Sequence, residues 1–336
     1  MNTIVIVTEA NESVATGHLM ECIVCANTLR EAGYKVAFWI NNDADHNLKK
    51  RIPCQFQEYL KSIEDDYNHL AESVLKITPK AIVFNLREIT EGFLNDIQAG
   101  IKKNTKIVCI DEFGHRNLPA DIIINPMIDP YYWEYENSKA HRFCGAQYLV
   151  LPEKLEELHQ KEKIVNQNIR RIIVSMGGVD PKKYTLDLVE IIPWMFPDAM
   201  IEIIVGGGNR NGKEIKEKAI KYNHVVIKEN ISNLPDLIYG ADLIICAGGN
   251  TLHESACIGT PAIVLPSMPH EERTAVCFAK KGFGMVVDTK GDWRKEILDL
   301  CDDMKSYKLR NSMCMKGKTI SDGKGRRRIV EIMNQI

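Results

Sequence analysis

The sequence has no long hydrophobic run. None of its apolar stretches approaches the roughly 20 residues that a helix needs to span a bilayer. The first of them, residues 4–7, follows no basic region and ends at Thr8 and Glu9, so we expect a strand and not a signal peptide. These absences predict a cytoplasmic protein with no stable membrane insertion.

A strong net charge is also missing. Lys and Arg number 43 and Asp and Glu number 45, which leaves a formal charge of -2 and no electrostatic reason to expect a nucleic-acid partner. The basic run at residues 324–328 is expected to be a solvated helix end, with contact to an anionic group as the alternative.

Paired cysteine motifs and a dinucleotide fingerprint are lacking as well. The ten cysteines are scattered, and Cys22 with Cys25 has redox or metal spacing but no second pair. Helical periodicity around these two residues favours core packing, which suits reduced thiols in a cytosolic protein. The glycine clusters at 177–178 and 206–208 do not have G-x-G-x-x-G spacing. We therefore expect no metal and no cofactor.

What the chain does contain is an alternation of short apolar runs and amphipathic helical stretches. Such alternation is typical of parallel sheets with helices on both faces. We expect an α/β fold of two Rossmann-like domains whose sheets face a central cleft, with ligands at the carboxyl ends of the strands. The predicted strands are residues 4–7, 36–40, 81–84, 106–110, 122–124, 171–175, 201–205, 225–227, 243–246, 262–265 and 285–287.

A polar segment at residues 153–168 interrupts this alternation and is expected to contain the boundary between the domains. The expected division is an N-terminal domain over residues 1–155, a linker over 156–168, a nucleotide-binding domain over 169–318 and a final helix over 319–336.

The most informative stretch is the glycine turn after the apolar run 243–246. Gly248, Gly249, Asn250 and Thr251 come between that run and a predicted helix. Free backbone N–H groups and the helix dipole at such a junction both favour an anion, so we predict a phosphate site. Glu254, one helical turn later, is placed to accept hydrogen bonds from ribose hydroxyls.

The other glycine clusters at strand ends are weaker signals. Gly177 follows the predicted strand 171–175 and adds to a phosphate-facing surface. For the cluster at 206–208 we favour an ordinary turn between a strand and a helix.

Gly17 and His18 stand at the start of the first predicted helix. The dipole there disfavours an imidazolium, so a neutral ring can act as a general base or polarise a water. A histidine that only caps or packs is the alternative, and Gly17 favours a function because it lets a ligand approach the backbone closely.

Several further polar residues follow predicted strands. His270 and Glu271 follow strand 262–265 and should lie beside the Gly248 turn, but adjacent residues cannot present metal ligands together without distant partners. Asp111 and Asn125 are as well suited to bracing loops as to touching substrate. The aromatic stretch 129–142 is expected to be an irregular binding loop.

With these residues in view, the chain resembles the UDP-2,4-diacetamido-2,4,6-trideoxy-β-L-altropyranose hydrolases of pseudaminic acid biosynthesis, a group that includes spore-coat polysaccharide proteins. It is more distantly similar to the N-acetylglucosaminyltransferase of peptidoglycan synthesis, which has the two-domain GT-B fold. The resemblance covers most of the chain. It is carried by TGHLMEC (16–22), Gly145 with Tyr148, VSMGGVDPKKYT (174–185), CAGGNTLHESACIGTPAIVL (246–265) and DGKGRRR (322–328).

Four positions depart from the pattern of that family. The family usually has Arg at the position of Glu21 and Gly at the position of Ala15. It tends to carry Asp and Tyr around residues 85–87, and an Asn-Gln pair where this chain has His270 and Glu271. These departures concern the sugar more than the nucleotide.

The resemblance implies a metal-independent, inverting hydrolase of a UDP-linked amino or deoxy sugar that works beside neighbouring enzymes of one sugar pathway. It places His18 at the catalytic histidine, Tyr148, His270 and Glu271 near the sugar, and the base against the backbone around Ile231. Two alternatives stay open. One is a glycosyltransferase with the same UDP-sugar donor, and the other is a nucleotide-sugar-binding protein without catalysis.

Overall fold

The computed structural model describes residues 2–9, 17–41, 52, 60–63, 76–87, 89–101, 104–136 and 138–336. The chain forms two compact units. Unit 1 comprises residues 1–152 together with 324–336, and unit 2 comprises residues 153–323. In this division the expected linker, residues 156–168, belongs to unit 2, and most of the expected final helix belongs to unit 1.

Unit 1 is built on a sheet of seven parallel strands in the order β3-β2-β1-β4-β5-β6-β7. Its central strands are continuous apolar runs, as expected for strands that are buried on both faces. The strands are β1 (Thr3–Thr8), β2 (Lys35–Asn41), β3 (Leu60–Ile63), β4 (Ala81–Asn85), β5 (Lys106–Ile110), β6 (Ile122–Asn125) and β7 (His141–Cys144).

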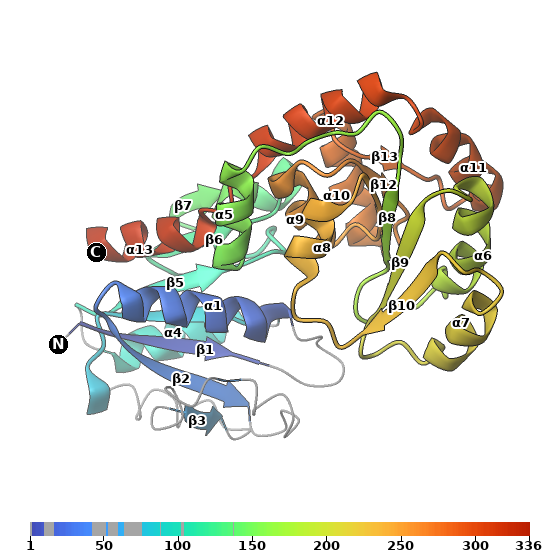
Figure 1. Cartoon of the computed structure of the whole chain (residues 1–336). Coiled ribbons are helices and arrows are strands. Elements are labelled where there is room, and N and C mark those ends of the chain that lie inside the picture. The colour runs from blue at the N-terminus through green and yellow to red at the C-terminus, as the bar shows by residue number, and fades with distance from the viewer. Residues whose placement is uncertain are drawn as a thin grey trace. The chain divides into compact units, whose positions relative to one another are not determined.

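Helices cover both faces of this sheet. Ile4 and Ile6 of β1 pack in one core cluster with α1 (Gly17–Glu31) and α13 (Gly325–Gln335). Val5 and Val7, which alternate with them, pack in a second cluster with α4 (Glu91–Gly100). The C-terminal helix α13 lies beside α1, although nearly the whole chain separates them in sequence (Figure 1). Two short 3-10 helices complete the unit, η2 (Pro130–Trp133) and η3 (Ala146–Tyr148).

Unit 2 has a sheet of six parallel strands in the order β10-β9-β8-β11-β12-β13. The strands are β8 (Arg171–Ser175), β9 (Met200–Val205), β10 (Val225–Glu229), β11 (Leu243–Cys246), β12 (Ala262–Val264) and β13 (Met285–Val286). The helices are α5 (Glu153–Gln160), α6 (Thr185–Met195), α7 (Gly212–Ala219), α8 (Leu234–Gly240), α9 (Asn250–Ile258), α10 (Pro269–Lys280), α11 (Trp293–Asp303) and α12 (Tyr307–Ile320).

Counted from its own first strand, unit 2 has the order 3-2-1-4-5-6, which is the order of a doubly wound Rossmann sheet, and unit 1 has the same order with a seventh strand, β7, added at the edge. The expectation of two Rossmann-like α/β domains is confirmed. The strands missed by the sequence analysis, β3 and β7, both lie at sheet edges. β7 was missed because its first residues, His141 and Arg142, are exposed and polar. The irregular loop expected at 129–142 therefore ends at residue 140, two residues earlier than predicted.

The spaced cysteines of α1 are core residues, as expected. Cys22 and Cys25 are buried in the cluster between the sheet, α1 and α13, and neither forms a disulfide. Burial raises the pKa of the Cys25 thiol to about 12, with a further increase from the nearby carboxylate of Glu21. Such thiols are poor nucleophiles and poor metal ligands.

The polar segment before β8 is held tightly within unit 2. The guanidinium of Arg310, fully buried on α12, donates to the carbonyls of Asn166 and Gln167 at 2.8 and 2.7 Å. Lys163 donates to the carbonyls of Tyr239 and Ala241, and burial lowers its pKa to about 8. These hydrogen bonds attach the segment to the rest of unit 2, while most of its polar side chains are exposed.

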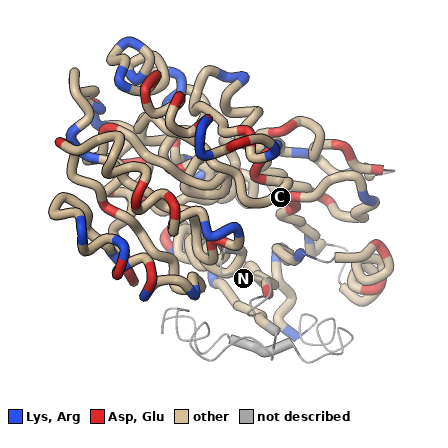
Figure 2. Tube along the Cα trace, turned by 90° about the vertical axis from the view of Figure 1, so that its right-hand side faces the viewer, with Lys and Arg blue, Asp and Glu red and all other residues tan. Residues whose placement is uncertain are grey.

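Acidic and basic residues interleave along the described trace (Figure 2), in agreement with the small formal charge. Within the described residues, no helix is both long enough and apolar enough to cross a bilayer.

Candidate functional site

The change in strand order of unit 2 falls between β8 and β11. The chain runs from β8 towards one edge of the sheet and from β11 towards the other, which opens a crevice at their carboxyl ends. Ser175 and Cys246, the last residues of these strands, are register partners. The glycine turns at 177–178 and 248–249 therefore leave the sheet at the same level and border this crevice.

The helix that follows the second turn has an open N-terminus. α9 begins after Gly249, no described side chain caps it, and its first turn has no acidic residue. The helix that follows β8, α6, differs, because Asp180 accepts hydrogen bonds from the N–H groups of Tyr184 and Thr185 at 3.0 and 2.9 Å. The first N–H groups and the positive dipole end of α9 are thus available to an anion.

Gly248 is pressed against the start of α10. A Cβ placed on Gly248 would lie 2.4 Å from the main-chain oxygen of Glu271, so only glycine fits here. This contact confirms the expectation that Glu271 lies beside the glycine turn. His270 is exposed at the start of the same helix.

Glu254 lies one turn after Asn250 on α9. Its Oε2 is buried and forms no hydrogen bond with the described residues. Burial raises the pKa of this carboxyl group to about 7. A buried acceptor without a partner is uncommon, and it is explained if a ligand supplies the donor.

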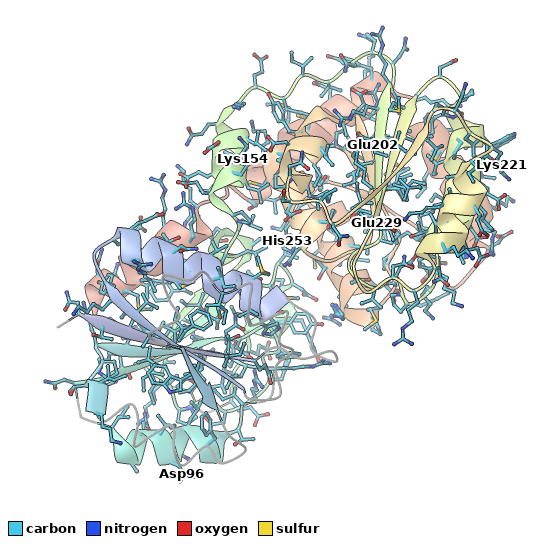
Figure 3. All side chains as sticks on the ribbon, turned by 60° about the horizontal axis from the view of Figure 1, so that its bottom comes forward. Asp96, Lys154, Glu202, Lys221, Glu229 and His253 are labelled. Carbon is cyan, nitrogen blue, oxygen red and sulfur yellow. The ribbon has the colours of Figure 1, made fainter. Side chains whose placement is uncertain are left out.

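His253, labelled in Figure 3, is the buried neighbour of Glu254 and was given no role by the sequence analysis. Its ring packs edge-to-face on Phe278 with the ring centroids 4.8 Å apart. Burial lowers its pKa to about 4, so the ring is neutral near pH 7. We interpret His253 as a core residue.

The glycine cluster after β9 supports the turn after β8. It forms turns that lead into α7, as the sequence analysis favoured. A Cβ on Gly206 would lie 2.4 Å from the carbonyl oxygen of Gly177, and the Gly208 N–H donates to Gly178 at 2.9 Å. The role of Gly206 was missed because close backbone contact leaves no pattern in the sequence. Half-buried Ile231 lies in the connection between β10 and α8.

Unit 1 has its own change in strand order, between β1 and β4. Thr8 and Asn85 end these strands as register partners, and both are buried. His18 is the second residue of α1, and its Nδ1 is buried without a partner among the described residues. The Asn85 amide donates to the carboxylate of Glu21 at 3.5 Å, which links the end of β4 to α1. The end of β1 lies beside them, because Thr8 is the register partner of Asn85.

Residues 10–16, which include Ala15 and the first residue of the resembling segment, Thr16, lie outside the described residues. Gly17 begins α1. The backbone N–H of Arg87, just after β4, donates to the carboxylate of Glu9, just after β1. This hydrogen bond joins the ends of β1 and β4.

Asp111 and Asn125 brace a loop, which was one of their two expected roles. Asp111 forms an ion pair with Arg116 and accepts a hydrogen bond from the Tyr135 hydroxyl at 2.8 Å. The Asn125 amide donates to the same hydroxyl and to the carbonyl of Tyr132, each at 2.7 Å. These bonds hold the aromatic stretch that begins at residue 129.

Tyr148 lies in η3 after β7. Its half-buried ring packs against the core cluster of α1 and α13 and meets Phe143 edge-to-face at 5.7 Å between centroids. Gly145, at the start of this turn, has a φ of 115°, which explains the glycine there. Among the described residues, no cluster of three or more His, Cys, Asp or Glu side chains is arranged to hold a metal ion.

With this geometry established, the chain can be compared with known proteins. Residues 172–326 match the model of the glycosyltransferase family 28 C-terminal domain. Over 326 residues the chain is 23% identical to a spore coat polysaccharide biosynthesis protein of Bacillus subtilis, covering 95% of this chain and 94% of that protein. The matched region contains both glycine turns, the open end of α9 and Glu254.

Two other relatives are matched less completely. An uncharacterized protein of Methanocaldococcus jannaschii is 25% identical over 274 residues, which are 78% of this chain but only 55% of that protein. A UDP-N-acetylglucosamine–N-acetylmuramyl-(pentapeptide) pyrophosphoryl-undecaprenol N-acetylglucosamine transferase of Caldanaerobacter subterraneus is 26% identical over 235 residues, 64% of each chain.

Solved structures extend the likeness of fold. MurG of Acinetobacter baumannii aligns over 100% of both chains with a TM-score of 0.70 and 14% identity. The UDP-GlcNAc 2-epimerase of Neisseria meningitidis, bound to UDP-GlcNAc, aligns over 99% of this chain and 100% of its own with a TM-score of 0.63 and 12% identity. Residues 172–326 therefore resemble the C-terminal domain of family 28 glycosyltransferases, the chain is similar to the spore coat protein over nearly its whole length, and its fold is that of GT-B proteins. Its named relatives include UDP-sugar-utilising transferases.

Proposed function

We propose that this protein is an enzyme that binds a UDP-linked sugar through unit 2 and transfers the sugar from UDP to an acceptor in the synthesis of a surface polysaccharide. The open N-terminus of α9 is the observation that carries the proposal. It lies beside the change in strand order, it is lined by glycine backbone, and it is suited to a diphosphate. The family 28 match over the same residues and the transferase names of several relatives support glycosyl transfer.

In this proposal the N–H groups of Gly248, Gly249, Asn250 and Thr251 hold the diphosphate. They also stabilise the charge that grows on it as the bond to the anomeric carbon breaks. Oε2 of Glu254 accepts hydrogen bonds from the ribose, which gives this buried oxygen its missing partner. Gly177 borders the same crevice, and the backbone around Ile231 reads the base.

On the sugar side, we propose that His18 removes a proton from the attacking hydroxyl group. Its Nδ1 is buried and has no partner among the described residues. His18 stands at the start of α1, which follows β1, and β1 borders the change in strand order of unit 1; both observations support this role. His270, exposed at the start of α10, and Tyr148 are the further candidates for contacts with the sugar.

Hydrolysis is the second candidate function, and it differs only in the nucleophile, because water then takes the place of the acceptor. The segment around His18, which resembles that of the pseudaminic acid hydrolases, favours it. So does the match to the spore coat protein over nearly the full length of both chains.

One experiment tests the proposal and separates the two reactions. UDP-2,4-diacetamido-2,4,6-trideoxy-β-L-altrose is incubated with the protein in oxygen-18 water with a chelator and without acceptor, and UDP is tested in parallel for thermal stabilisation. UDP release with label on the sugar establishes hydrolysis. Stabilisation by UDP without release supports transfer, or a different sugar. If UDP does not stabilise the protein, the nucleotide site is wrong.

A further inference from the structure

Glu271 joins two loops of unit 2 that follow neighbouring strands. Its Oε2 accepts three hydrogen bonds, from the N–H and Oγ of Ser267 at 2.8 and 2.7 Å and from the N–H of Met268 at 3.1 Å. Ser267 and Met268 lie between β12 and α10, so the side chain reaches back over the start of its own helix, as in a capping box.

The other side of Glu271 faces the glycine turn after β11. Its main-chain oxygen would lie 2.4 Å, and its Cβ 2.8 Å, from a Cβ on Gly248. β11 and β12 are adjacent in the sheet, and Glu271 contacts both of the loops that follow them. The position of the Gly248 backbone therefore depends on where the first turn of α10 is held.

The charge of Glu271 opposes a direct contact with phosphate. Its Oε1 would lie 3.7 Å from a Cβ on Gly249, so the carboxylate is close to the start of α9. Burial raises the pKa of the nearby Cys246 thiol, and the carboxylates of Glu271 and Glu254 raise it further. This carboxylate would repel a diphosphate bound at the start of α9. The positive dipole end of α10 offsets part of that repulsion. We therefore expect Glu271 to affect nucleotide binding by fixing the position of the Gly248 backbone and not by contact with the phosphate.

We propose that Glu271 is a positioning residue of the nucleotide site, and this rests on the proposed function. By tying Ser267 and Met268 to the first turn of α10, it fixes the surface on which Gly248 rests. This support sets the direction of the N–H groups at the start of α9.

The test is the dissociation constant of UDP for the full chain, measured by calorimetry well below the melting temperature. Glu271→Ala removes the acceptor and is expected to weaken UDP binding about tenfold, the size of a lost helix cap. Glu271→Gln keeps an oxygen that can accept the same bonds and lacks the charge, so it should bind UDP as tightly as the wild type or more tightly. Glu271→Asp shortens the side chain by one methylene group and should also weaken UDP binding. It replaces the alanine variant in the test if that variant does not fold.

The matched control is the next residue. Glu272 forms an exposed ion pair with Lys290 at 2.8 Å, so Glu272→Ala should leave UDP binding unchanged. If Glu271→Ala and Glu271→Asp bind UDP like the wild type while melting earlier, Glu271 is only a helix cap and the inference fails. If Glu271→Gln binds UDP as weakly as Glu271→Ala does, UDP binding needs the charge of Glu271, and the proposed positioning role is wrong. If the wild type itself does not bind UDP, the proposed function and the inference both fail.

Discussion

The two units share a strand order but differ in what lines the point where that order changes. In unit 2 the crevice is bordered by the turns at 177–178 and 248–249, which present backbone. In unit 1 the corresponding edge carries the side chains of Thr8, His18 and Asn85. Backbone donors suit a group that many ligands share, such as a diphosphate, whereas side chains provide selectivity and proton transfer. The comparison is consistent with the proposal that unit 2 binds the nucleotide and unit 1 supplies the chemistry.

Removing the imidazole of His18 tests the chemical half of this comparison and has the largest expected effect. His18→Ala should lower turnover of the UDP-sugar by about 10²–10⁴-fold, the usual contribution of a general base. The dissociation constant of UDP should not change, because the nucleotide is held by unit 2. Single-turnover kinetics and calorimetry measure the two quantities separately.

A variant that keeps more than about a tenth of the wild-type turnover would exclude His18 as the base. A variant that loses UDP binding instead would show that the assignment of roles to the two units is wrong. His253→Gln serves as the comparison at a buried histidine that we place in the core. It should lower the melting temperature and keep most of the turnover.

The proposed role of unit 2 in nucleotide binding is tested by adding a single methyl group to Gly248. In Gly248→Ala the new Cβ would lie 2.4 Å from the main chain of Glu271, so the turn or α10 must move. Overpacking of this kind costs about 1–3 kcal/mol, which corresponds to a roughly ten- to hundredfold loss of UDP affinity. Calorimetry with UDP measures the loss.

Gly207→Ala is the matched control in a neighbouring glycine turn, since nothing lies within 4 Å of its added Cβ. It should bind UDP as the wild type does. Equal losses in the two variants would mean that glycine flexibility is what matters, and the role given to the close contact at Gly248 would be wrong.

Most of the fold was predictable because its central strands are apolar runs. β8 and β11 were predicted with the bounds that the structure has, and the doubly wound arrangement followed from the alternation with helices. The edge strand β7 was not predictable in this way, because it begins with exposed polar residues. Composition predicts a linker at residues 156–168. The hydrogen bonds of that segment could not be predicted from composition: buried Arg310 donates to two of its carbonyls, and its half-buried Lys163 donates to a carbonyl of Tyr239.

The candidate site was predictable where local chemistry defines it. A glycine turn before a helix indicates an anion site from sequence alone, and Gly248 and Glu254 were found in this way. Contacts between distant segments were not predictable. The support that Gly206 gives to Gly177, and the three hydrogen bonds that occupy Glu271, depend on how loops from adjacent strands meet.

The smallest expected effect concerns the one side chain that unit 2 is proposed to use in nucleotide binding. Glu254 has a pKa raised to about 7 by burial. Ribose hydroxyls donate to the ionised form and favour it, so binding should release a proton. The affinity for UDP-GlcNAc, whose diphosphate does not titrate near neutral pH, should therefore rise about tenfold at most from pH 6 to pH 8.

The unliganded protein should show the opposite trend in stability. The pKa of Glu254 is higher in the folded state than the ordinary value of 4.5, so its favourable contribution is complete below about pH 4.5 and is lost as the pH rises through 7. Relative to Glu254→Gln, the melting temperature of the wild type should fall across that interval, and the variant should bind UDP-GlcNAc independently of pH. If both proteins showed the same pH dependence of affinity, Glu254 would not contact the ribose. Nucleotide binding in unit 2 would then depend on backbone groups alone, which would sharpen the contrast with unit 1.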